Sequence, residues 1–250
     1  MIALITGATA GIGKSTAYKL AENNYNLILT GRRKDRLDNI KNEIEKKYGV
    51  KVLTLCFDIR NKIECQNALN GLPDEWKQID VLINNAGLAQ GLATIPNGLE
   101  EDWDTMIDTN IKGFLYVSKI VSNWMINRKQ GHIINVGSIA GKEVYPNGNV
   151  YCATKHAVDA LSKAMRMELL PFNIRVSAIH PGMVETEFSL VRFKGNAERA
   201  KQTYQGLQPL TADDIADAIW WMINRPAHVN INEMIITPTA QANSRDIIKN

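Results

Sequence analysis

The sequence predicts one α/β domain built on a doubly wound, seven-stranded parallel sheet with helices on both faces. Short continuous apolar runs alternate with longer segments of helical periodicity along all 250 residues, a pattern typical of parallel strands buried on both faces. A glycine-rich turn directly follows the first apolar run, where dinucleotide-binding sheets hold a pyrophosphate. Together these observations predict a Rossmann fold.

The apolar runs mark the strands, which are expected at residues 2–6, 26–30, 51–56, 80–83, 131–137, 174–180 and 233–237. Apolar residues that recur with helical spacing place helices near residues 12–23, 34–47, 61–70, 101–127, 150–170, 189–204 and 212–224. Neither a repeat, a low-complexity tract nor a shift in composition divides the chain, so residues 1–250 are predicted to form a single domain.

Charge and composition exclude several classes of function. A net charge of +3 without a long basic run is too small to indicate a nucleic-acid surface. No apolar run reaches the ~18 residues that a membrane span requires, and the chain enters its first strand without a signal-peptide pattern. The three cysteines, Cys56, Cys65 and Cys152, lack metal-ligand spacing, which suits a reducing compartment. We therefore expect a cytoplasmic protein that binds no nucleic acid, membrane or metal.

The turn Thr6–Gly13 is the first candidate cofactor site. Its first glycine allows a tight turn, its second lets the backbone approach a ligand, and its third lets helix and strand pack closely. A pyrophosphate would then meet the free N–H groups and the positive dipole end of the following helix. The spacing is G-x-x-x-G-x-G rather than G-x-G-x-x-G, and a purely structural turn is the alternative. The residues predicted to contact the cofactor here are Gly7, Thr9, Ala10, Gly11, Ile12 and Gly13.

Arg32 and Arg33 follow the second strand, where the adenosine ribose of a dinucleotide is expected. A carboxylate at this point would bind the ribose hydroxyls and repel a 2′-phosphate, but no carboxylate comes before Asp35. The cations stand at the start of a helix, where the dipole disfavours positive charge unless an anion binds there, and guanidinium matches a phosphate well. We therefore predict NADP rather than NAD, with a solvated basic turn as the alternative.

Three further loops at strand ends carry candidate cofactor residues. Asp58 either accepts a hydrogen bond from adenine or caps the next helix. The small residues after the fourth strand let a ribose and a pyrophosphate lie against the backbone, whereas Asn84 is expected to tie neighbouring strands together. The turn after the sixth strand either presents N–H groups to a carboxamide or simply ends the strand. The predicted contacts in these loops are Asp58, Ile59, Asn85, Ala86, Gly87, Pro181, Gly182, Val184 and Thr186.

Tyr151 and Lys155 are the candidate catalytic pair. Side chains four residues apart on a helix share one face, and Tyr151 is the only one of the seven tyrosines with a lysine four places later. A tyrosine titrates near pH ~10, but a cation about 4 Å away contributes about 4 kcal/mol at an effective dielectric near 20. We therefore expect Lys155 to bring the pKa of Tyr151 toward neutral pH, where an acid/base works best. A tyrosine stacked on a lysine stem of an amphipathic helix is the alternative.

With these motifs in this order, the chain resembles the short-chain dehydrogenase/reductase family over nearly its whole length. The resemblance rests on the turn Thr6–Gly13, Asn84-Asn85-Ala86-Gly87, Asn110, Ser138, Tyr151-x-x-x-Lys155 and Pro181-Gly182. Phrases such as Met106-Ile107-Asp108-Thr109-Asn110 and Val191-Arg192-Phe193-Lys194-Gly195 are similar to one subgroup. This subgroup comprises NADP-dependent 3-hydroxy acid dehydrogenases that oxidise serine or L-allo-threonine and reduce malonic semialdehyde.

The resemblance implies a role for each matching residue. Tyr151 would be the acid/base, and Lys155 would lower its pKa and hold the nicotinamide ribose. Ser138 would hydrogen-bond the substrate oxygen, and Asn110 would hold a water that relays protons from Lys155. The segment from Gly182 to Thr186 would present the nicotinamide, and the cofactor would be NADP(H).

Substrate choice is expected to lie in a lid around residues 187–206. This segment carries Arg192, Lys194 and Arg199, and a bidentate arginine is a good partner for a carboxylate. Arg192 is therefore a candidate substrate ligand beside Ser138 and Tyr151, and the expected substrate is a short 3-hydroxy acid. A solvated helix face is the alternative explanation of the lid charges.

Two other functions stay open at this point. One is a 3-oxoacyl carrier-protein reductase, or another carbonyl reductase, with the same mechanism. The other is an NADP-binding sensor without turnover, although such a protein would be expected to lack Tyr151 or Lys155. The family also implies a homotetramer, or a homodimer, built on the helices around residues 101–127 and 150–170 and on the C-terminal strand.

Overall fold

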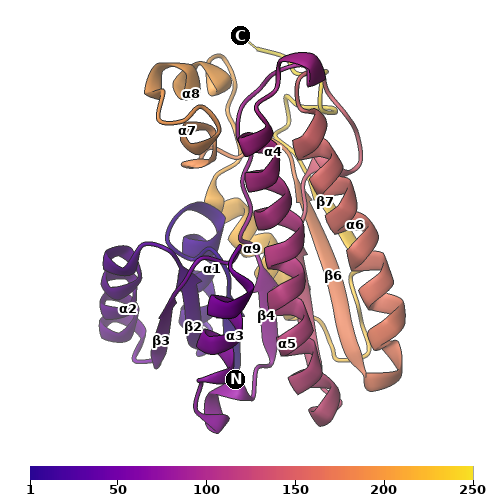
Figure 1. The fold of residues 1–250 in the computed structure, drawn as a ribbon. Helices are drawn as coiled ribbons and strands as arrows, with labels where there is room; N and C mark the ends of the chain where they lie inside the picture. Colours follow the sequence, from indigo (N-terminus) through magenta and orange to yellow (C-terminus); the bar gives the residue numbers. More distant parts are fainter. Residues whose placement is uncertain (250) are drawn as a thin grey trace.

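The seven strands form one parallel sheet in the order β3-β2-β1-β4-β5-β6-β7 (Figure 1). The computed structural model describes residues 1–249. The strands are β1 (Ile2–Ile5), β2 (Asn26–Gly31), β3 (Val52–Cys56), β4 (Val81–Asn84), β5 (Gly131–Val136), β6 (Ile174–Pro181) and β7 (Glu233–Ile236). The order reverses between β1 and β4, and this switch point is where open α/β sheets bind ligands, beyond the carboxyl ends of the strands.

The helices connect the strands and cover the sheet. They are α1 (Gly11–Glu22), α2 (Lys34–Tyr48), α3 (Lys62–Asn70), α4 (Glu100–Ile107), α5 (Phe114–Arg128), α6 (Asn149–Leu169), α7 (Phe188–Arg192), α8 (Ala197–Tyr204) and α9 (Ala212–Ile223). Among residues 1–249, no helix has the length and apolar character needed to cross a membrane.

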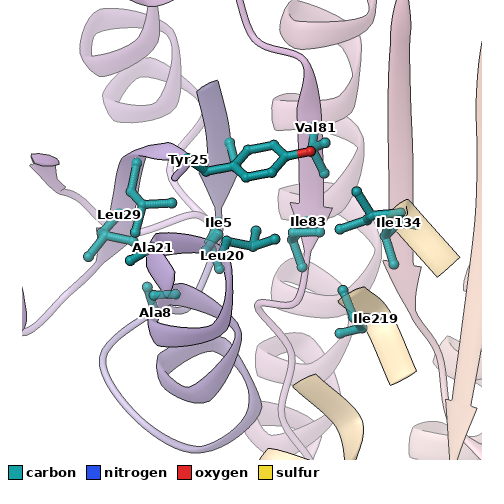
Figure 2. Close-up of a cluster of buried hydrophobic side chains, with 14 of the residues drawn as sticks. Ile5, Ala8, Leu20, Ala21, Tyr25, Leu29, Val81, Ile83, Ile134 and Ile219 are labelled. Atoms are coloured by element: carbon teal, nitrogen blue, oxygen red, sulfur yellow. The ribbon is translucent and has the colours of Figure 1, made fainter. Parts of the chain in front are cut away.

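Alternate residues of each strand pack on opposite faces of the sheet, as the pleat requires. Ile5 of β1 belongs to a buried cluster with residues of α1, α2 and α9, whereas Leu4 belongs to a second cluster with residues of α3 and α5. Figure 2 shows the first cluster, with Ile5, Leu20, Ile83 and Ile219 gathered from β1, α1, β4 and α9. Burial on both faces explains why the strands read as continuous apolar runs.

Two predicted helices are interrupted. The predicted helix 101–127 contains a π-helical turn, Asp108–Gly113, between α4 and α5. The predicted helix 189–204 is two helices, because Lys194 and Gly195 have φ of 52° and 89°, a left-handed conformation that ends a right-handed helix. Asn196 then caps α8 by accepting a hydrogen bond from the backbone N–H of Arg199 at 3.0 Å. The helix prediction for residues 189–204 is therefore right about helical content and wrong about continuity.

Candidate active site

The glycine turn after β1 is packed against the loop after β4. A Cβ on Gly7 would lie 2.9 Å from Cα of Ala86, and one on Gly13 would lie 2.5 Å from the carbonyl oxygen of Gly7. Gly7 and Gly11 also have positive φ, 67° and 51°, which glycine adopts without strain. The N-cap of α1 is Ala10, which has no side-chain oxygen to accept hydrogen bonds, so the first N–H groups of this helix are left for an anion.

Asn84 and Asn85 hold the sheet and the glycine turn in place. Nδ2 of Asn84 donates to Ser118 Oγ and to Asn135 Oδ1, both at 2.9 Å, which confirms the predicted tie between strands. Nδ2 of Asn85 donates to the carbonyl oxygens of Thr6 at 2.9 Å and Gly7 at 3.2 Å. The Asn85 side chain thus supports the turn from beneath, in addition to bordering the cavity described below.

The arginines after β2 lie at the adenosine end of the site. Nε and Nη2 of Arg33 donate to Thr9 Oγ1 at 3.1 Å and 2.7 Å. Nη1 of Arg33 pairs with Oε2 of Glu187, the first lid residue, at 2.8 Å. The side chain of Arg32 is 56% exposed, with its Nη1 3.8 Å from Oδ2 of Asp58. Arg33 is therefore fixed by two partners, and Arg32 is held loosely.

Asp58 does not cap α3, which excludes one of the two roles considered for it. Asn61 caps the helix instead, because its Oδ1 accepts hydrogen bonds from the N–H groups of Ile63 at 3.0 Å and Glu64 at 3.3 Å. The carboxylate of Asp58 faces the guanidinium of Arg60, whose Nη2 donates to Oδ2 at 2.6 Å. Burial raises the pKa of Asp58, but the hydrogen bonds from Arg60 outweigh burial and keep that pKa below its usual value.

One cavity of about 520 Å³ joins these parts, a volume typical of small-molecule sites. It is lined by all the predicted cofactor, substrate and catalytic residues except Gly13 and Asn110. Gly13 lies against the backbone of Gly7 beneath the turn. Asn110 lies behind Gly87, at whose Cβ position its Oδ1 would be 3.3 Å away.

Tyr151, Lys155 and Ser138 meet at the centre of the cavity. Tyr151 and Lys155 lie on α6 and are buried, 8% and 6% exposed. Nζ of Lys155 donates to the carbonyl oxygen of Val136 at 2.9 Å, and burial lowers the Lys155 pKa to about 8. Ser138 follows β5, and its Oγ accepts a hydrogen bond from the N–H of Ala140 at 3.1 Å.

The pKa of Tyr151 differs from the expectation. Burial raises it above the usual value, and neighbouring Tyr145 raises it further, whereas Ser138 and Arg192 lower it and only partly offset these effects. The ammonium of Lys155 donates to the Val136 carbonyl at 2.9 Å, whereas the guanidinium of Arg192 lies over the Tyr151 ring. The effective neighbouring cation of Tyr151 is therefore Arg192.

Asn110 lies in the π-helical turn and is almost fully buried. Its Oδ1 accepts from the N–H of Leu88 at 2.9 Å, and its Nδ2 donates to the Leu88 carbonyl at 2.8 Å and to Thr154 Oγ1 at 3.0 Å. The position that would hold a Cβ on Gly87 is 3.4 Å from Nζ of Lys155. Asn110 thus positions the loop that passes directly beside the lysine, and π-turns frequently occur at functional sites.

The predicted lid segment, residues 187–206, brings one of its three cations to the candidate catalytic tyrosine. The guanidinium carbon of Arg192 lies 5.5 Å from the ring centroids of both Tyr151 and Tyr145, and its Nη2 donates to the Tyr145 hydroxyl at 2.8 Å. By contrast, Nζ of Lys194 pairs with Oδ1 of Asp102 at 2.8 Å. Arg199 lies over the ring of Phe193, 4.5 Å from its centroid. These two cations therefore stabilise the lid itself.

Tyr145 and Glu187 were missed by the sequence reasoning. Tyr145 has no lysine four places later, and its approach to Arg192 depends on a lid 47 residues away in the chain. Glu187 is 154 residues from Arg33. The sequence offered one indication of this ion pair: a carboxylate at the start of the predicted lid and a basic segment after β2.

A second cluster of charged residues lies on β6, β7 and α6. Ligand-type atoms of Asp159, His180 and Glu233 lie within 4.8 Å of one another. Nζ of Lys142 lies among them, 2.6 Å from Asp159 Oδ1 and 2.5 Å from Glu233 Oε2. An ammonium group therefore provides the positive charge that this group of carboxylates requires.

The fold and the site together define a class of protein: a Rossmann domain in which a tyrosine and a lysine of one helix line the cavity. A family model described as short chain dehydrogenase matches residues 1–196, and the chain belongs to this family of oxidoreductases. The fold class and family predicted from the sequence are thus confirmed.

The chain is similar to named members of the family. It is 47% identical over 243 residues to the NADP-dependent 3-hydroxy acid dehydrogenase YdfG of Salmonella typhi, covering 97% of this chain and 96% of that protein. It is 43% identical over 239 residues to a serine 3-dehydrogenase of Rhizobium radiobacter, covering 96% and 94%. The closed form of a serine dehydrogenase complexed with NADP+ superposes with a TM-score of 0.93, at 43% identity and full coverage of both chains.

Proposed function

We propose that this protein is an NADP-dependent dehydrogenase of short 3-hydroxy acids. One observation carries the proposal: a single cavity has an anchored arginine, Arg33, at its adenosine end and another arginine, Arg192, over the candidate catalytic tyrosine. The first suits a 2′-phosphate and the second suits a carboxylate. The names of the similar proteins, 3-hydroxy acid dehydrogenase and serine 3-dehydrogenase, agree with both assignments.

The cofactor assignment rests on the fit of the groove. The glycine turn leaves no room for side chains between β1 and the loop after β4, so a pyrophosphate can approach the start of α1. Arg32 and Arg33 supply the guanidinium groups for a 2′-phosphate. NADP supplies the hydride acceptor of the oxidation, while the protein supplies position and charge.

Burial keeps the Tyr151 hydroxyl protonated, so during oxidation Tyr151 is proposed to pass its own proton to the Lys155 relay while it takes the alcohol proton, and to do the reverse during reduction. Ser138 donates a hydrogen bond to the same substrate oxygen and stabilises the charge that develops there. The lowered pKa of Lys155, about 8, allows this lysine to release and regain a proton near neutral pH. Lys155 thus fits a relay from Tyr151 toward solvent, with a water held near Asn110.

Arg192 is proposed to bind the substrate carboxylate. The guanidinium has five N–H donors, and its contact with Tyr145 uses one Nη2–H, so donors remain for an anion beside Tyr151. A carboxylate held there would place the alcohol oxygen of a short hydroxy acid within reach of the tyrosine hydroxyl. Residues 187–206 would act as the substrate lid.

We further propose that the protein is a cytoplasmic homotetramer. Exposed apolar side chains support two contact faces: Met167 and Leu170 on and after α6, 70% and 73% exposed, and Ile235 on the terminal strand β7, 56% exposed. Strand β7 lies at the end of the sheet, so two copies related by a two-fold axis could pair there. Light scattering tests this proposal, and a stable monomer would contradict it.

The function is tested by the absorbance of the reduced nicotinamide. Purified protein would be offered NADP and NAD separately with serine, 3-hydroxyisobutyrate and neutral secondary alcohols. The proposal predicts turnover with NADP on the hydroxy acids, and little on neutral alcohols of equal size. Turnover on carrier-linked acyl substrates alone would favour the 3-oxoacyl reductase, and cofactor binding without any turnover would favour the sensor.

A further inference from the structure

Glu187 joins the lid to the arginines at the adenosine end of the cavity. Its Oε2 is 2.8 Å from Nη1 of Arg33, and its Oε1 is 2.6 Å from Nη1 of Arg36. One carboxylate therefore bridges two guanidinium groups of the β2–α2 region. These hydrogen bonds outweigh the effect of burial, which acts to raise the pKa of Glu187, and keep that pKa below its usual value.

The bridge ends at Arg33, which is expected to bind the 2′-phosphate of the cofactor. Arg33 is oriented by Thr9, which accepts from its Nε and Nη2. Three of the five guanidinium N–H donors are thus engaged by Thr9 and Glu187. A phosphate bound by Arg33 and Arg32 would lie close to the Glu187 carboxylate, and two anions at this separation repel each other.

Glu187 directly precedes the short helix α7, and the C-terminal end of α7 is fixed near Tyr151, the candidate catalytic tyrosine. The N–H of Gly91 donates to the Arg192 carbonyl at 3.0 Å, and Lys194 pairs with Asp102. Phe188, the residue after Glu187, packs edge-on against Tyr151 with ring centroids 5.6 Å apart. Glu187 is thus adjacent in the chain to a residue whose ring packs on Tyr151.

We propose that Glu187 is a specificity residue that competes with the cofactor 2′-phosphate for Arg33 and so couples the identity of the cofactor to the position of the lid. The proposal rests on the NADP assignment above. A 2′-phosphate carries about −1.5 to −2 charges near neutral pH, so it displaces the single carboxylate from Arg33 and leaves Glu187 on Arg36. NAD has no phosphate there and leaves the bridge intact.

The first expected effect concerns affinity. Removing the charge in Glu187→Gln removes the competitor, so the affinity for NADPH should rise about 2- to 5-fold, as for one partly exposed ion pair, while the affinity for NADH stays the same. In Arg36→Gln the Glu187 carboxylate has Arg33 as its remaining arginine partner. It should compete more strongly with the 2′-phosphate for Arg33, so the affinity for NADPH should fall. That fall should shrink in the double variant, because Arg36 acts partly through Glu187.

The second expected effect concerns the lid. Trypsin can cleave after Arg192, Lys194, Arg199 and Lys201 within residues 187–206. If the bridge opens only with a 2′-phosphate, the rate of lid cleavage in the wild type should differ between saturating NADP and saturating NAD. In Glu187→Gln the two rates should be equal.

The experiment is a fluorescence titration of the full-length chain with NADPH and NADH, followed by limited trypsin digestion. Glu185→Gln is the matched control, because Glu185 is an exposed carboxylate two residues away in the same loop and outside the bridge. Thermal melts of all variants check folding; Arg33→Gln is included as a reference. An unchanged NADPH to NADH affinity ratio in Glu187→Gln, or an equal change in Glu185→Gln, would overturn the inference.

The reference variant separates this inference from the proposed function. If Arg33→Gln loses affinity for NADPH but Glu187→Gln leaves the ratio unchanged, only the role of Glu187 is wrong. If Arg33→Gln leaves the preference for NADPH unchanged, Arg33 does not bind the 2′-phosphate. The proposed competition between Glu187 and that phosphate is then wrong as well.

Discussion

Two regions that border the cavity, the glycine turn and the predicted lid, are held by different kinds of interaction. At the glycine turn, backbone atoms of β1, α1 and the loop after β4 pack so closely that a Cβ on Gly13 would be 2.5 Å from a carbonyl oxygen. The lid, in contrast, is held by partly exposed ion pairs to distant elements, Glu187 to Arg33 and Lys194 to Asp102. Figure 1 shows this difference in placement: α7 and α8 project beyond the sheet, while α1 lies against it.

This difference agrees with the proposal that the glycine turn binds the cofactor and that residues 187–206 select the substrate. Close backbone packing permits few substitutions, because an added methyl group has no free volume to occupy. Partly exposed ion pairs contribute little to stability each, so they can be exchanged one at a time. The glycine turn is therefore suited to a constant ligand, and the lid to a variable one.

The largest expected effect is at Tyr151, which Phe188 and Arg192 of residues 187–206 contact. Tyr151→Phe removes the proton donor and acceptor but retains the ring that packs on Phe188, so kcat should fall by about 10²- to 10⁴-fold. Cofactor affinity and the melting temperature should stay near those of the wild type. Steady-state kinetics with a fluorescence titration check both, and retention of a tenth of the activity would exclude Tyr151 as the acid/base.

The next effect contrasts one glycine from each region. Gly13→Ala places a methyl group against the Gly7 carbonyl and should lower the free energy of unfolding by about 1–3 kcal/mol. Gly195 in the lid has no atom within 4 Å of its Cβ position and a φ of 89°. Asparagine tolerates left-handed backbone better than most residues, so Gly195→Asn keeps only the backbone strain and should cost about 1 kcal/mol or less. Urea unfolding measures both, and equal losses would contradict the contrast.

A third effect concerns the buried cation. Burial lowers the Lys155 pKa from 10.5 to about 8 in the native state, whereas an unfolded lysine keeps a pKa near ~10.4. Below pH 8 both states are protonated and the native state bears the full cost of a buried charge. As the pH rises from about 8 to 10.5, the native state loses its proton first, so this destabilisation is progressively relieved.

Lys155→Met should therefore be more stable than the wild type at pH 7, and the difference should vanish as the pH approaches 10.5. Lys201→Met, which removes an exposed lysine within residues 187–206, is the control substitution. Free energies of unfolding at pH 7 and at high pH provide the test. A stability difference that grows with pH would show that the sign is wrong.

The sequence predicted the parts that depend on local order. Strand positions followed from burial on both faces, and Gly7, Gly11 and Gly13 marked a turn that only glycine can form so tightly. The spacing of Tyr151 and Lys155 placed both on one helix face. Asn84 was correctly predicted to tie the strands, because an amide within an apolar strand must find partners inside the sheet.

The remaining features depend on contacts that local sequence does not encode. The break at Lys194 and Gly195 interrupts a pattern that reads as one amphipathic helix. The pKa of Tyr151 depends on the burial of its ring and on which group Lys155 bonds, and helix spacing fixes neither. The bridge from Glu187 to Arg33 joins residues 154 positions apart, and the order of charges along the chain does not show that these two residues pair.

The most direct test of the account is whether Arg192 recognises the substrate carboxylate. We would measure kcat/KM for a short 3-hydroxy acid and for its neutral amide at saturating NADP, in the wild type and in Arg192→Met. A charge-assisted hydrogen bond contributes about 1.5–3 kcal/mol, so the wild type should prefer the acid by about 10- to 150-fold. That preference should disappear in Arg192→Met, with the rate on the amide little changed; an equal preference in both proteins would contradict the account.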